Sequence, residues 1–572
     1  MAKAKLPITN YQLLITDVLI IGAGGAGLRA AIEAAKQNVK VLIVIKEPLG
    51  EAHTAMAAGG LNVAIKPPAT PAQHYEDTIK GGWHINNHKL VKIFTEEMPD
   101  RIYDLESYGV KFDRLPDGSF YTWAGGKHSA PLNLCAGDYT GREMMRGLKA
   151  EVNRLKIPTL QNHFVTKLLT SNGRVIGAFA IDQNSRHPMG GRMDSPGVEY
   201  KVILAKATIV AAGGAGQLYE ITTNAPSNTG EGYAWGLDIG AAMIDMEFVQ
   251  FHPTGMVYPK HLRGALVTEK VRGHGGRLLN NKDERFMERY QPERLELAGR
   301  DEVARAIYQE IAEGRGTKHG GVYLDVTHWE RGQVEKLIPE VFHTHMEVGI
   351  DIRKRPMEIA PSMHHMMGGF KINKWGEASI PGLFACGEVT ASIHGANRLG
   401  GNSLAEGQVF GRRTGLRAAQ SALETKRHLG GSRMDSPEVD VTGEISRIES
   451  LKRKSGTNPQ SIRKQLQNLM WQYAGIIRNE EGLHKGLKSL TSLTSQTKNL
   501  SAQTAEDLQS SLELLEMLKV AEMILTAALM REESRGAHYR SDYPKMDAKW
   551  EKNIVLQKKN GKIAPKIIPV IT

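Results

Sequence analysis

Short apolar runs alternate with helical patterns through the first three quarters of the chain. Val18–Ile21 is an apolar run that predicts a buried strand, a small-residue helix pattern follows it, and Val41–Ile45 predicts a second strand. Further apolar runs lie within 207–216 and 380–404, and each ends in glycines. Strands that alternate with helices in this way are typical of an α/β fold with a largely parallel sheet.

The pattern changes from about residue 441 onward. Leu, Lys, Glu and Gln recur at helical spacing, most clearly in 461–479 and 507–530, which predicts a helical C-terminal region. The last residues, 544–572, are rich in lysine and predict an irregular, basic surface segment. The pentapeptide RMDSP occurs at 192–196 and again at 433–437, and we expect loops at both places.

The turn after the first strand carries the first chemical signal. In "TDVLIIGAGGAGLRAAIEAAKQ" the glycines allow a tight turn, a close approach of backbone to a pyrophosphate, and a helix whose N-terminus faces the phosphates. A strand before the motif and a second strand after it make this a dinucleotide-binding prediction. The end of the second strand carries Ile45 and Lys46 where an acid that binds ribose is common, so recognition of NAD is less well supported. The predicted contacts here are Gly22, Ala23, Gly24, Gly25, Ala26, Gly27 and Lys46.

Two later stretches favour FAD over NAD. "ATIVAAGGAG" (207–216) predicts a strand that returns to the same sheet, and "IPGLFACGEVTASIHGANRLGGNSL" (380–404) predicts another strand followed by Glu388 and a glycine-rich turn into a helix. In flavoproteins of this architecture an acid in that place reaches the ribityl chain, and a helix N-terminus points at the pyrimidine end of the flavin. We therefore predict FAD contacts at Glu388, Ser403 and Leu404.

The composition narrows the classes of protein to which the chain can belong. Of the 572 residues, 41% are hydrophobic and 24% are charged, as in a soluble globular protein, and the net charge of +11 permits an anionic substrate. Cys135 and Cys386 are the only cysteines, too few for a disulfide framework or a cysteine-ligated cluster, so any iron–sulfur chemistry requires another chain. We see no signal peptide and no membrane-spanning run. We expect a cytoplasmic protein that reaches a membrane only through partners.

A set of motifs in a fixed order makes the resemblance specific. The chain resembles the flavoprotein subunit of succinate dehydrogenase and fumarate reductase over most of its length. The matching pieces are "HTAMAAGG" (53–60), "DMEFVQFHPTG" (245–255), "LVTEKVRGHGG" (266–276), "RDEVARAI" (300–307), "HHMMGG" (364–369), "HGANRLGGNSL" (394–404) and "ESRGAHYRSDYP" (533–544).

The resemblance implies how the flavin is held. The histidine of the family's HT pair is joined covalently to FAD, and His53 occupies that place; such a link raises the flavin potential. L-Aspartate oxidase, a close relative, lacks that histidine. Further implied cofactor contacts are Thr54, Gly59, Gly60 and Glu231. Ala58 replaces a glutamine of the family pattern, which leaves the tuning of the flavin open.

The resemblance also implies a site for a dicarboxylate. Arg398 and His364 match the residues for one carboxylate, and His252 and Thr268 match those for the other; arginine suits this task because its fork binds carboxylate bidentately. Proton transfer falls to Arg300, with Glu269 and Arg272 as its relay to solvent. Hydride then passes to flavin N5 on the opposite side of the substrate. Removing the proton from arginine at pH 7 costs roughly 7 kcal/mol, so donation to fumarate is the easier direction.

These motifs predict the domains and leave three functions open. The fold is an α/β one, with a discontinuous Rossmann-type FAD-binding domain (14–255 and 356–430), an inserted α+β capping domain (256–355), a helical C-terminal domain (441–543) and the basic segment (544–572). The favoured function is a succinate dehydrogenase or fumarate reductase subunit of the tricarboxylic acid cycle or electron transport, which passes electrons to an iron–sulfur partner and on to quinone. The alternatives are an L-aspartate oxidase-like enzyme and a non-catalytic flavin-binding protein. Substitutions at Lys127, His128 and His365 leave room for another dicarboxylate.

Overall fold

The apolar runs that predict strands meet in one sheet. The structure, a computed structural model, describes residues 11–183, 198–428, 439–453 and 455–572. The sheet has the order β6-β2-β1-β9-β8-β7, with β16 also paired to β9. Its pairs are parallel except for β7–β8 and β8–β9. The strands are β1 (Tyr11–Ile21), β2 (Val41–Val44), β6 (Thr159–Leu160), β7 (His163–Ser171), β8 (Arg174–Asp182), β9 (Glu199–Val210) and β16 (Leu383–Ala385).

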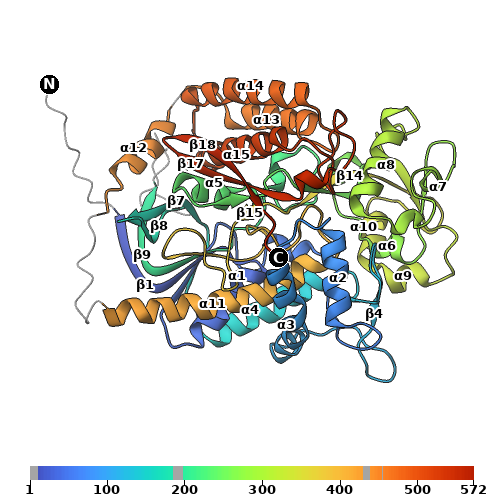
Figure 1. Ribbon diagram of the computed structural model, residues 1–572, viewed down its shortest axis with the longest axis horizontal. Coiled ribbons are helices and arrows are strands. Elements are labelled where there is room, and N and C mark those ends of the chain that lie inside the picture. The colour runs from blue at the N-terminus through green and yellow to red at the C-terminus, as the bar shows by residue number, and fades with distance from the viewer. Residues whose placement is uncertain (1–10, 184–197, 429–438, 454) are drawn as a thin grey trace.

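Helices cover the face of the sheet where the glycine-rich turn lies. Gly411 and Gly415 allow the long helix α11 to lie against α1, since a methyl group at either position would come within 2.6 Å of a carbonyl oxygen of α1. Figure 1 shows α1, α3, α4 and α11 on one side of the sheet and α13–α15 on the other. The helices on the first side are α1 (Gly25–Ala35), α2 (Pro71–Gly81), α3 (His88–Ser107), α4 (Thr140–Arg154) and α11 (Asn402–His428), with a small sheet of β3 (Leu61–Asn62), β5 (Asn133–Leu134) and β4 (Thr122–Trp123) beside them.

An inserted unit projects at one end of the molecule, drawn in yellow-green in Figure 1. Its buried apolar residues, from Met256 to Ile359, form a core cluster of their own, which supports the predicted capping domain. Two long strands, β11 and β14, pair with each other and lead into and out of it. The elements are β11 (Val249–Met256), α6 (Lys270–Gly273), β12 (Arg277–Leu279), α7 (Met287–Tyr290), α8 (Arg300–Ala312), β13 (Val322–Asp325), α9 (Gln333–Leu337), α10 (Pro339–Glu347) and β14 (Met357–Met366).

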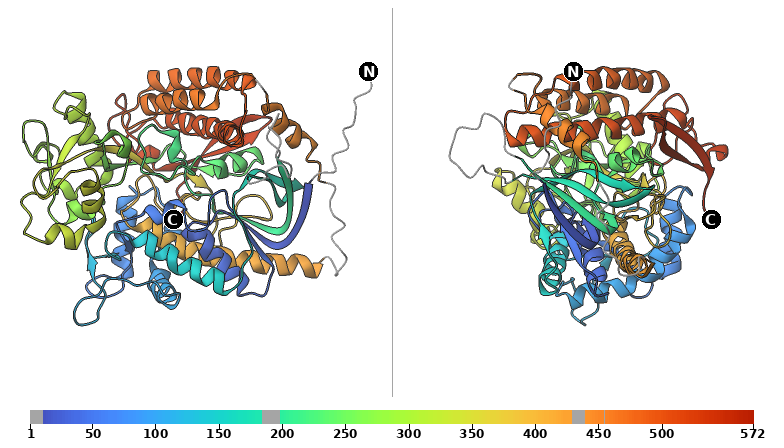
Figure 2. Two further views of the ribbon diagram at one scale, coloured as in Figure 1. Left: turned by 180° about the vertical axis from the view of Figure 1, so that it is seen from behind. Right: turned by 90° about the vertical axis from the view of Figure 1, so that its left-hand side faces the viewer.

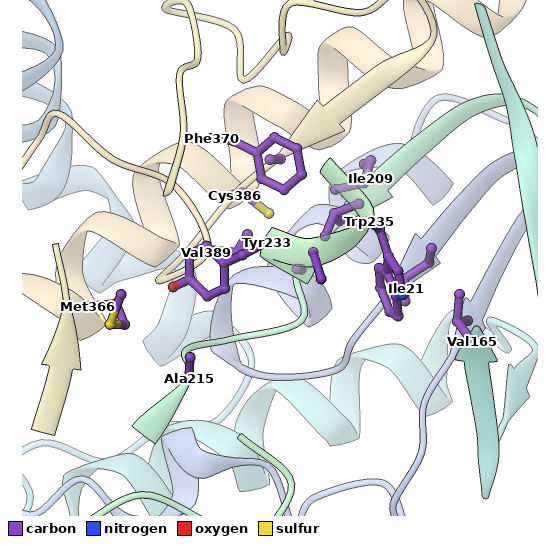
Figure 3. Close-up of a cluster of buried hydrophobic side chains, with 14 of the residues drawn as sticks. Ile21, Val165, Ile209, Ala215, Tyr233, Trp235, Met366, Phe370, Cys386 and Val389 are labelled. Atoms are coloured by element: carbon purple, nitrogen blue, oxygen red, sulfur yellow. The ribbon is translucent and has the colours of Figure 1, made fainter. Parts of the chain in front are cut away.

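The predicted C-terminal helices are present and share the core of the large sheet. They are α12 (Thr442–Leu451), α13 (Pro459–Tyr473), α14 (Glu480–Gln496) and α15 (Ala505–Met530). Helix α15 is buried on nearly all sides and packs on α5 (Glu231–Asp238); a methyl group at Gly230, just before α5, would lie 2.8 Å from Ala215 Cβ and 3.2 Å from Val520 Cγ2. Figure 3 shows Tyr233 and Trp235 of α5 among Ile21, Ile209 and Phe370 in this core.

The prediction of an irregular segment at 544–572 is wrong. Residues in it form a hairpin of β17 (Lys552–Lys559) and β18 (Lys562–Pro569), which completes a four-stranded sheet with β10 (Met243–Ile244) and β15 (Gly369–Phe370). Asn560 and Gly561 both have positive φ, as the tight turn of a hairpin requires. The lysines concealed the buried run Asn553–Leu556, which anchors β17. Figure 2 shows the hairpin beside the C-terminal helices.

The remaining sequence expectations concern loops and membranes. Both copies of RMDSP lie outside the described residues. Within the described ranges, helices long and apolar enough to cross a bilayer do not occur. The division into three domains and a C-terminal segment at the stated boundaries stays a prediction.

Candidate active site

One cavity joins nearly all the predicted site residues. Its wall includes the predicted cofactor contacts Gly22, Ala23, Gly24, Gly25, Ala26, Gly27, Lys46, His53, Thr54, Gly59, Gly60, Glu231, Glu388, Ser403 and Leu404. It also includes the predicted substrate and catalytic residues His252, Thr268, Glu269, Arg300, His364 and Arg398. Residues from several separate stretches of the chain between positions 21 and 407 therefore converge on a single site.

The glycine-rich turn forms a cradle that fits a dinucleotide. Gly22 has a φ of +105°, and a methyl group there would lie 2.2 Å from the carbonyl oxygen of Ala211. The first N–H of α1, that of Gly25, bonds Thr54 Oγ1 at 3.0 Å, and Gly24 supplies no side chain to cap the helix. A helix N-terminus that opens onto a cavity is suited to a diphosphate, so the residues present fit FAD at this end.

Lys46 is held by two acids at the far end of the cradle. Its Nζ lies 2.6 Å from Oε1 of Glu231 and 3.1 Å from Oε1 of Glu513, which comes from α15. Arg463 of α13 pairs with the other oxygen of Glu513 at 3.1 Å. This network connects the predicted nucleotide site to the C-terminal helices.

His53 lies in a short 3₁₀ turn, His53–Met56, at the cavity wall. The backbone N–H of Ala225 donates to its Nδ1 at 3.3 Å, so Nε2 is the nitrogen left for another partner. Burial lowers the pKa of His53, which keeps the imidazole neutral at pH 7. Ala58 also lines the cavity, at the position where the family pattern has a glutamine.

Glu388 and His365 lie together on another part of the wall. Oε1 of Glu388 accepts the Met366 N–H at 3.0 Å and lies 3.5 Å from Nδ1 of His365. Nε2 of His365 is buried without a hydrogen-bond partner among the described residues. Burial raises the pKa of Glu388 and holds that of His365 well below its ordinary value.

The residues predicted to bind carboxylates come from different elements. His252 on β11 and His364 on β14 face each other with ring centroids 5.0 Å apart, because these strands pair antiparallel. The backbone N–H of Thr254 donates to Nδ1 of His252 at 3.3 Å, so the neutral ring carries its proton on Nε2. His364 Nδ1 lies 2.7 Å from Thr223 Oγ1. Both histidines therefore offer one ring nitrogen to the cavity side.

Burial sets the charge of this group. It holds the pKa values of His252 and His364 well below 6.5, and nearby arginines lower them further. Burial, with Arg300 next in effect, lowers the pKa of Arg398 to about 9, which leaves the guanidinium protonated at pH 7. Nε of Arg398 is buried without a hydrogen-bond partner among the described residues. The site thus presents neutral N–H donors and a guanidinium, which is a suitable set for a dicarboxylate.

Arg300 is the first residue of α8, and Glu269 binds its guanidinium. Its Nε and Nη2 lie 2.8 and 2.5 Å from Oε2 of Glu269, and Nη1 donates to Oε1 of Gln250 at 3.1 Å. Burial alone would raise the pKa of Glu269, but Arg300 and then Arg272 outweigh it and hold the pKa below its ordinary value. The other oxygen of Glu269 accepts the Gly126 N–H at 3.0 Å.

Arg272 stands apart from the other predicted residues. It is buried but does not line the cavity, and its Nη1 donates to the carbonyl oxygen of Glu296 at 2.6 Å. Its Nε and Nη2 have no hydrogen-bond partner among the described residues. The role of Arg272 as the second half of a relay stays a prediction, as do the roles assigned to the other site residues.

Sequence reasoning missed three partners. Gln250 lies two residues before His252 on the same face of β11, so the two-residue period of a strand was a usable signal. Gly126 and Glu513 gave no signal, because they contact Glu269 and Lys46 across 143 and 467 positions of sequence.

Comparison with known proteins gives matches over most of the chain. Residues 17–404 match the family model described as "FAD binding domain", and residues 463–572 match "Fumarate reductase flavoprotein C-term". One subunit of the "Fumarate reductase (CoM/CoB)" of Methanothermobacter marburgensis is 43% identical over 97% of this chain and 99% of that protein. The L-aspartate oxidase of Arabidopsis thaliana is 34% identical over 92% of this chain and 81% of that protein.

Solved structures and a further relative lead to the same family. The succinate dehydrogenase flavoprotein subunit of Coxiella burnetii is 35% identical over 94% of both chains. Mycobacterium smegmatis Sdh1 is 36% identical with a TM-score of 0.84 over 98% of this chain and 95% of that one. A quinol–fumarate reductase with menaquinol is 32% identical with a TM-score of 0.89 over 98% of each. The chain therefore belongs to the family of FAD-dependent flavoprotein subunits of succinate dehydrogenase and fumarate reductase.

Proposed function

We propose that this protein interconverts fumarate and succinate. The observation that carries the proposal is the meeting, in one cavity, of the glycine cradle and the Arg300–Glu269 pair with Arg398, His252 and His364. FAD, when bound, supplies the hydride acceptor and donor for this reaction. The protein has to fix the substrate and to move one proton.

Two groups of residues fix the dicarboxylate. Arg398 and His364 take one carboxylate, and His252 with Thr268 takes the other. A guanidinium and neutral N–H donors bind carboxylates without adding a proton to them, because the imidazoles stay neutral at pH 7. Both ends of the substrate are then fixed, so its central carbons are oriented for transfer.

Arg300 moves the proton. Glu269 is ionised beside it and occupies Nε and Nη2, which orients the guanidinium and leaves Nη1 with Gln250. An arginine that is protonated at rest is ready to donate, so the arrangement favours the reduction of fumarate. Arg300 is then reprotonated through Glu269, which first takes a proton from Arg272, and solvent returns the proton to Arg272.

The attachment of the flavin and the route of the electrons belong to the same proposal. We infer that Nε2 of His53 bonds covalently to FAD, since Nδ1 is occupied by the Ala225 N–H. Groups of three or more metal-ligating side chains do not occur among the described residues, so an iron–sulfur partner would carry electrons to or from quinone. Such a partner would place the protein at the cytoplasmic face of a membrane, in the tricarboxylic acid cycle or an electron transport chain.

The test is a substrate panel with the purified protein. Flavin reduced under anaerobic conditions should be reoxidised by fumarate, and oxidised flavin should bleach with succinate. L-Aspartate should do neither at a comparable rate. Bleaching by aspartate and not by succinate would support the L-aspartate oxidase alternative, and no response to any of the three would support a non-catalytic flavin protein.

A further inference from the structure

The turn Gly125–His128 lies at the boundary between the inserted unit and the FAD-binding part of the chain. It follows β4, which lies beside the inserted unit (Figure 1). Trp123 of β4 packs on Gly273 of that unit. Lys127 and His128 line a second cavity, separate in its lining from the site described above, together with Asp77 and Glu302. The proposed function gives this turn no role.

One side of the turn contacts the inserted unit. Gly126 donates its N–H to Glu269 Oε1 at 3.0 Å, and the Lys127 N–H donates to the carbonyl oxygen of Leu297 at 3.4 Å. A side chain at Gly126 would crowd its neighbours, since a methyl group there would lie 3.0 Å from the carbonyl oxygen of Ala298 and 3.1 Å from Glu269 Oε1. The position of the Gly126 N–H therefore sets where Glu269 can lie.

The other side of the turn is fixed by His128. Nδ1 of this half-buried ring accepts the Gly125 N–H at 2.8 Å, and Nε2 lies 3.3 Å from the carbonyl oxygen of Gly400. Gly400 is two residues after Arg398, and a methyl group on it would lie 2.7 Å from Glu269 Oε2 and 3.0 Å from Arg300 Nη2. His128 thus ties the turn that holds Glu269 to the backbone that covers the Glu269–Arg300 pair.

The hydrogen bonds define the protonation of the ring. Asn62 Nδ2 also lies 3.3 Å from Nε2, but it donates to Gly400 O and to Asn402 Oδ1, which uses both of its hydrogens. Nε2 therefore carries the proton that bonds Gly400, and Nδ1 is a lone-pair acceptor. A second proton on Nδ1 would face the Gly125 N–H and break the contact.

We propose that His128 is a positioning residue for proton transfer, which fixes the turn whose Gly126 N–H orients Glu269 against Arg300. The inference rests on the proposed function of that pair. Neutral His128 acts on Glu269 through the turn, and it does not contact the substrate. When His128 is lost, Glu269 can rotate away from Arg300, and proton delivery slows while the carboxylate site stays intact.

The charged and titratable groups around His128 come from three other elements. They are Glu269 before α6, Arg300 of α8, and Asp77 and His74 of α2, in addition to Lys127 on the same turn. Burial lowers the pKa of His128, so its protonation occurs below the ordinary value of 6.5. The acceptor at Nδ1 is then present at neutral pH.

The experiment compares His128→Ala and His128→Asn with the wild type in fumarate reduction. In His128→Ala, kcat should fall by on the order of tenfold to a hundredfold, KM should change by less than about threefold, and the solvent isotope effect on kcat should rise. His128→Asn keeps an acceptor near the position of Nδ1 and should recover most of kcat. In the wild type, kcat should fall as the pH is lowered, because His128 takes up a second proton. The same fall should be absent from His128→Asn.

His345→Asn is the matched control, because that histidine is also buried but bonds, among the described residues, within its own helix, to Val341 O at 2.7 Å. It should match the wild type in kcat and in the isotope effect. The inference is overturned if His128→Ala keeps the wild-type kcat and isotope effect, or if KM alone rises. A wild type that reduces no fumarate would instead overturn the proposed function.

Discussion

Nη2 of Arg300 lies 2.5 Å from Oε2 of Glu269, and Nε of the same guanidinium lies 2.8 Å from that oxygen. A single carboxylate oxygen thus binds two nitrogens of an arginine that is 9% exposed. Buried ion pairs are stable only when the geometry is good and further hydrogen bonds complete them, and here Gln250 and Gly126 do so. The pair is held in one arrangement before substrate arrives.

Arg300→Lys should abolish most turnover. Lysine keeps the charge but cannot bond Glu269 and Gln250 at once, so we expect kcat for fumarate reduction to fall by about 10²–10⁴-fold. Steady-state rates with a reduced dye measure this. Arg305→Lys is the control, because Arg305 lies on the same helix but bonds the carbonyl oxygen of Gly536. Equal rates in the two variants would show that Arg300 does not transfer the proton.

A covalent flavin is the second expectation. Acid precipitation of the holoprotein should give a yellow pellet, and His53→Ser should release its colour to the supernatant. His163→Ser, which changes another histidine of the cavity wall, should keep a yellow pellet. The physical reason is that His53 has a neutral ring whose Nδ1 is occupied by the Ala225 N–H, which leaves Nε2 for the flavin. A colourless wild-type pellet would show that FAD is bound without a covalent bond.

The local sequence predicted the parts of this site, and tertiary structure supplied their connections. The strand at 18–21 and the glycine turn follow from periodicity and motif, so the dinucleotide fold was predictable. The pairing of β11 with β14, which brings His252 to His364, depends on strand register that local patterns do not specify. The C-terminal hairpin was missed because its lysines outweighed the Asn560–Gly561 turn signal.

The contact between Lys46 and Glu513 predicts how the C-terminal helices support the nucleotide end of the site. Glu513→Gln would leave Arg463 without its ionised partner and weaken the hold on Lys46, so we expect a loss of about 1–3 kcal/mol in the free energy of unfolding. The affinity for FAD, measured in a His53→Ser background, should fall as well. Glu516→Gln is the control, since Glu516 pairs with Lys519 on the same helix. A change in affinity shared by both variants would argue against a specific link.

The last prediction concerns acid stability and His74. This fully buried ring bonds Asn402 Oδ1 through Nε2 at 3.0 Å and meets the edge of Phe94, and burial lowers its pKa to about 4. In the unfolded chain the ring takes up a proton near pH 6.5. Above that pH, neutral His74 therefore makes its full contribution to the free energy of unfolding. It is lost as the pH falls towards 4, and the loss approaches roughly 3 kcal/mol.

Urea unfolding of the wild type and His74→Gln between pH 7.5 and 4.5 measures the effect. The difference between their free energies of unfolding should narrow in acid. His484→Gln, at an exposed histidine, should follow the wild type throughout. Parallel pH curves for His74→Gln and the wild type would show that another group causes the acid sensitivity.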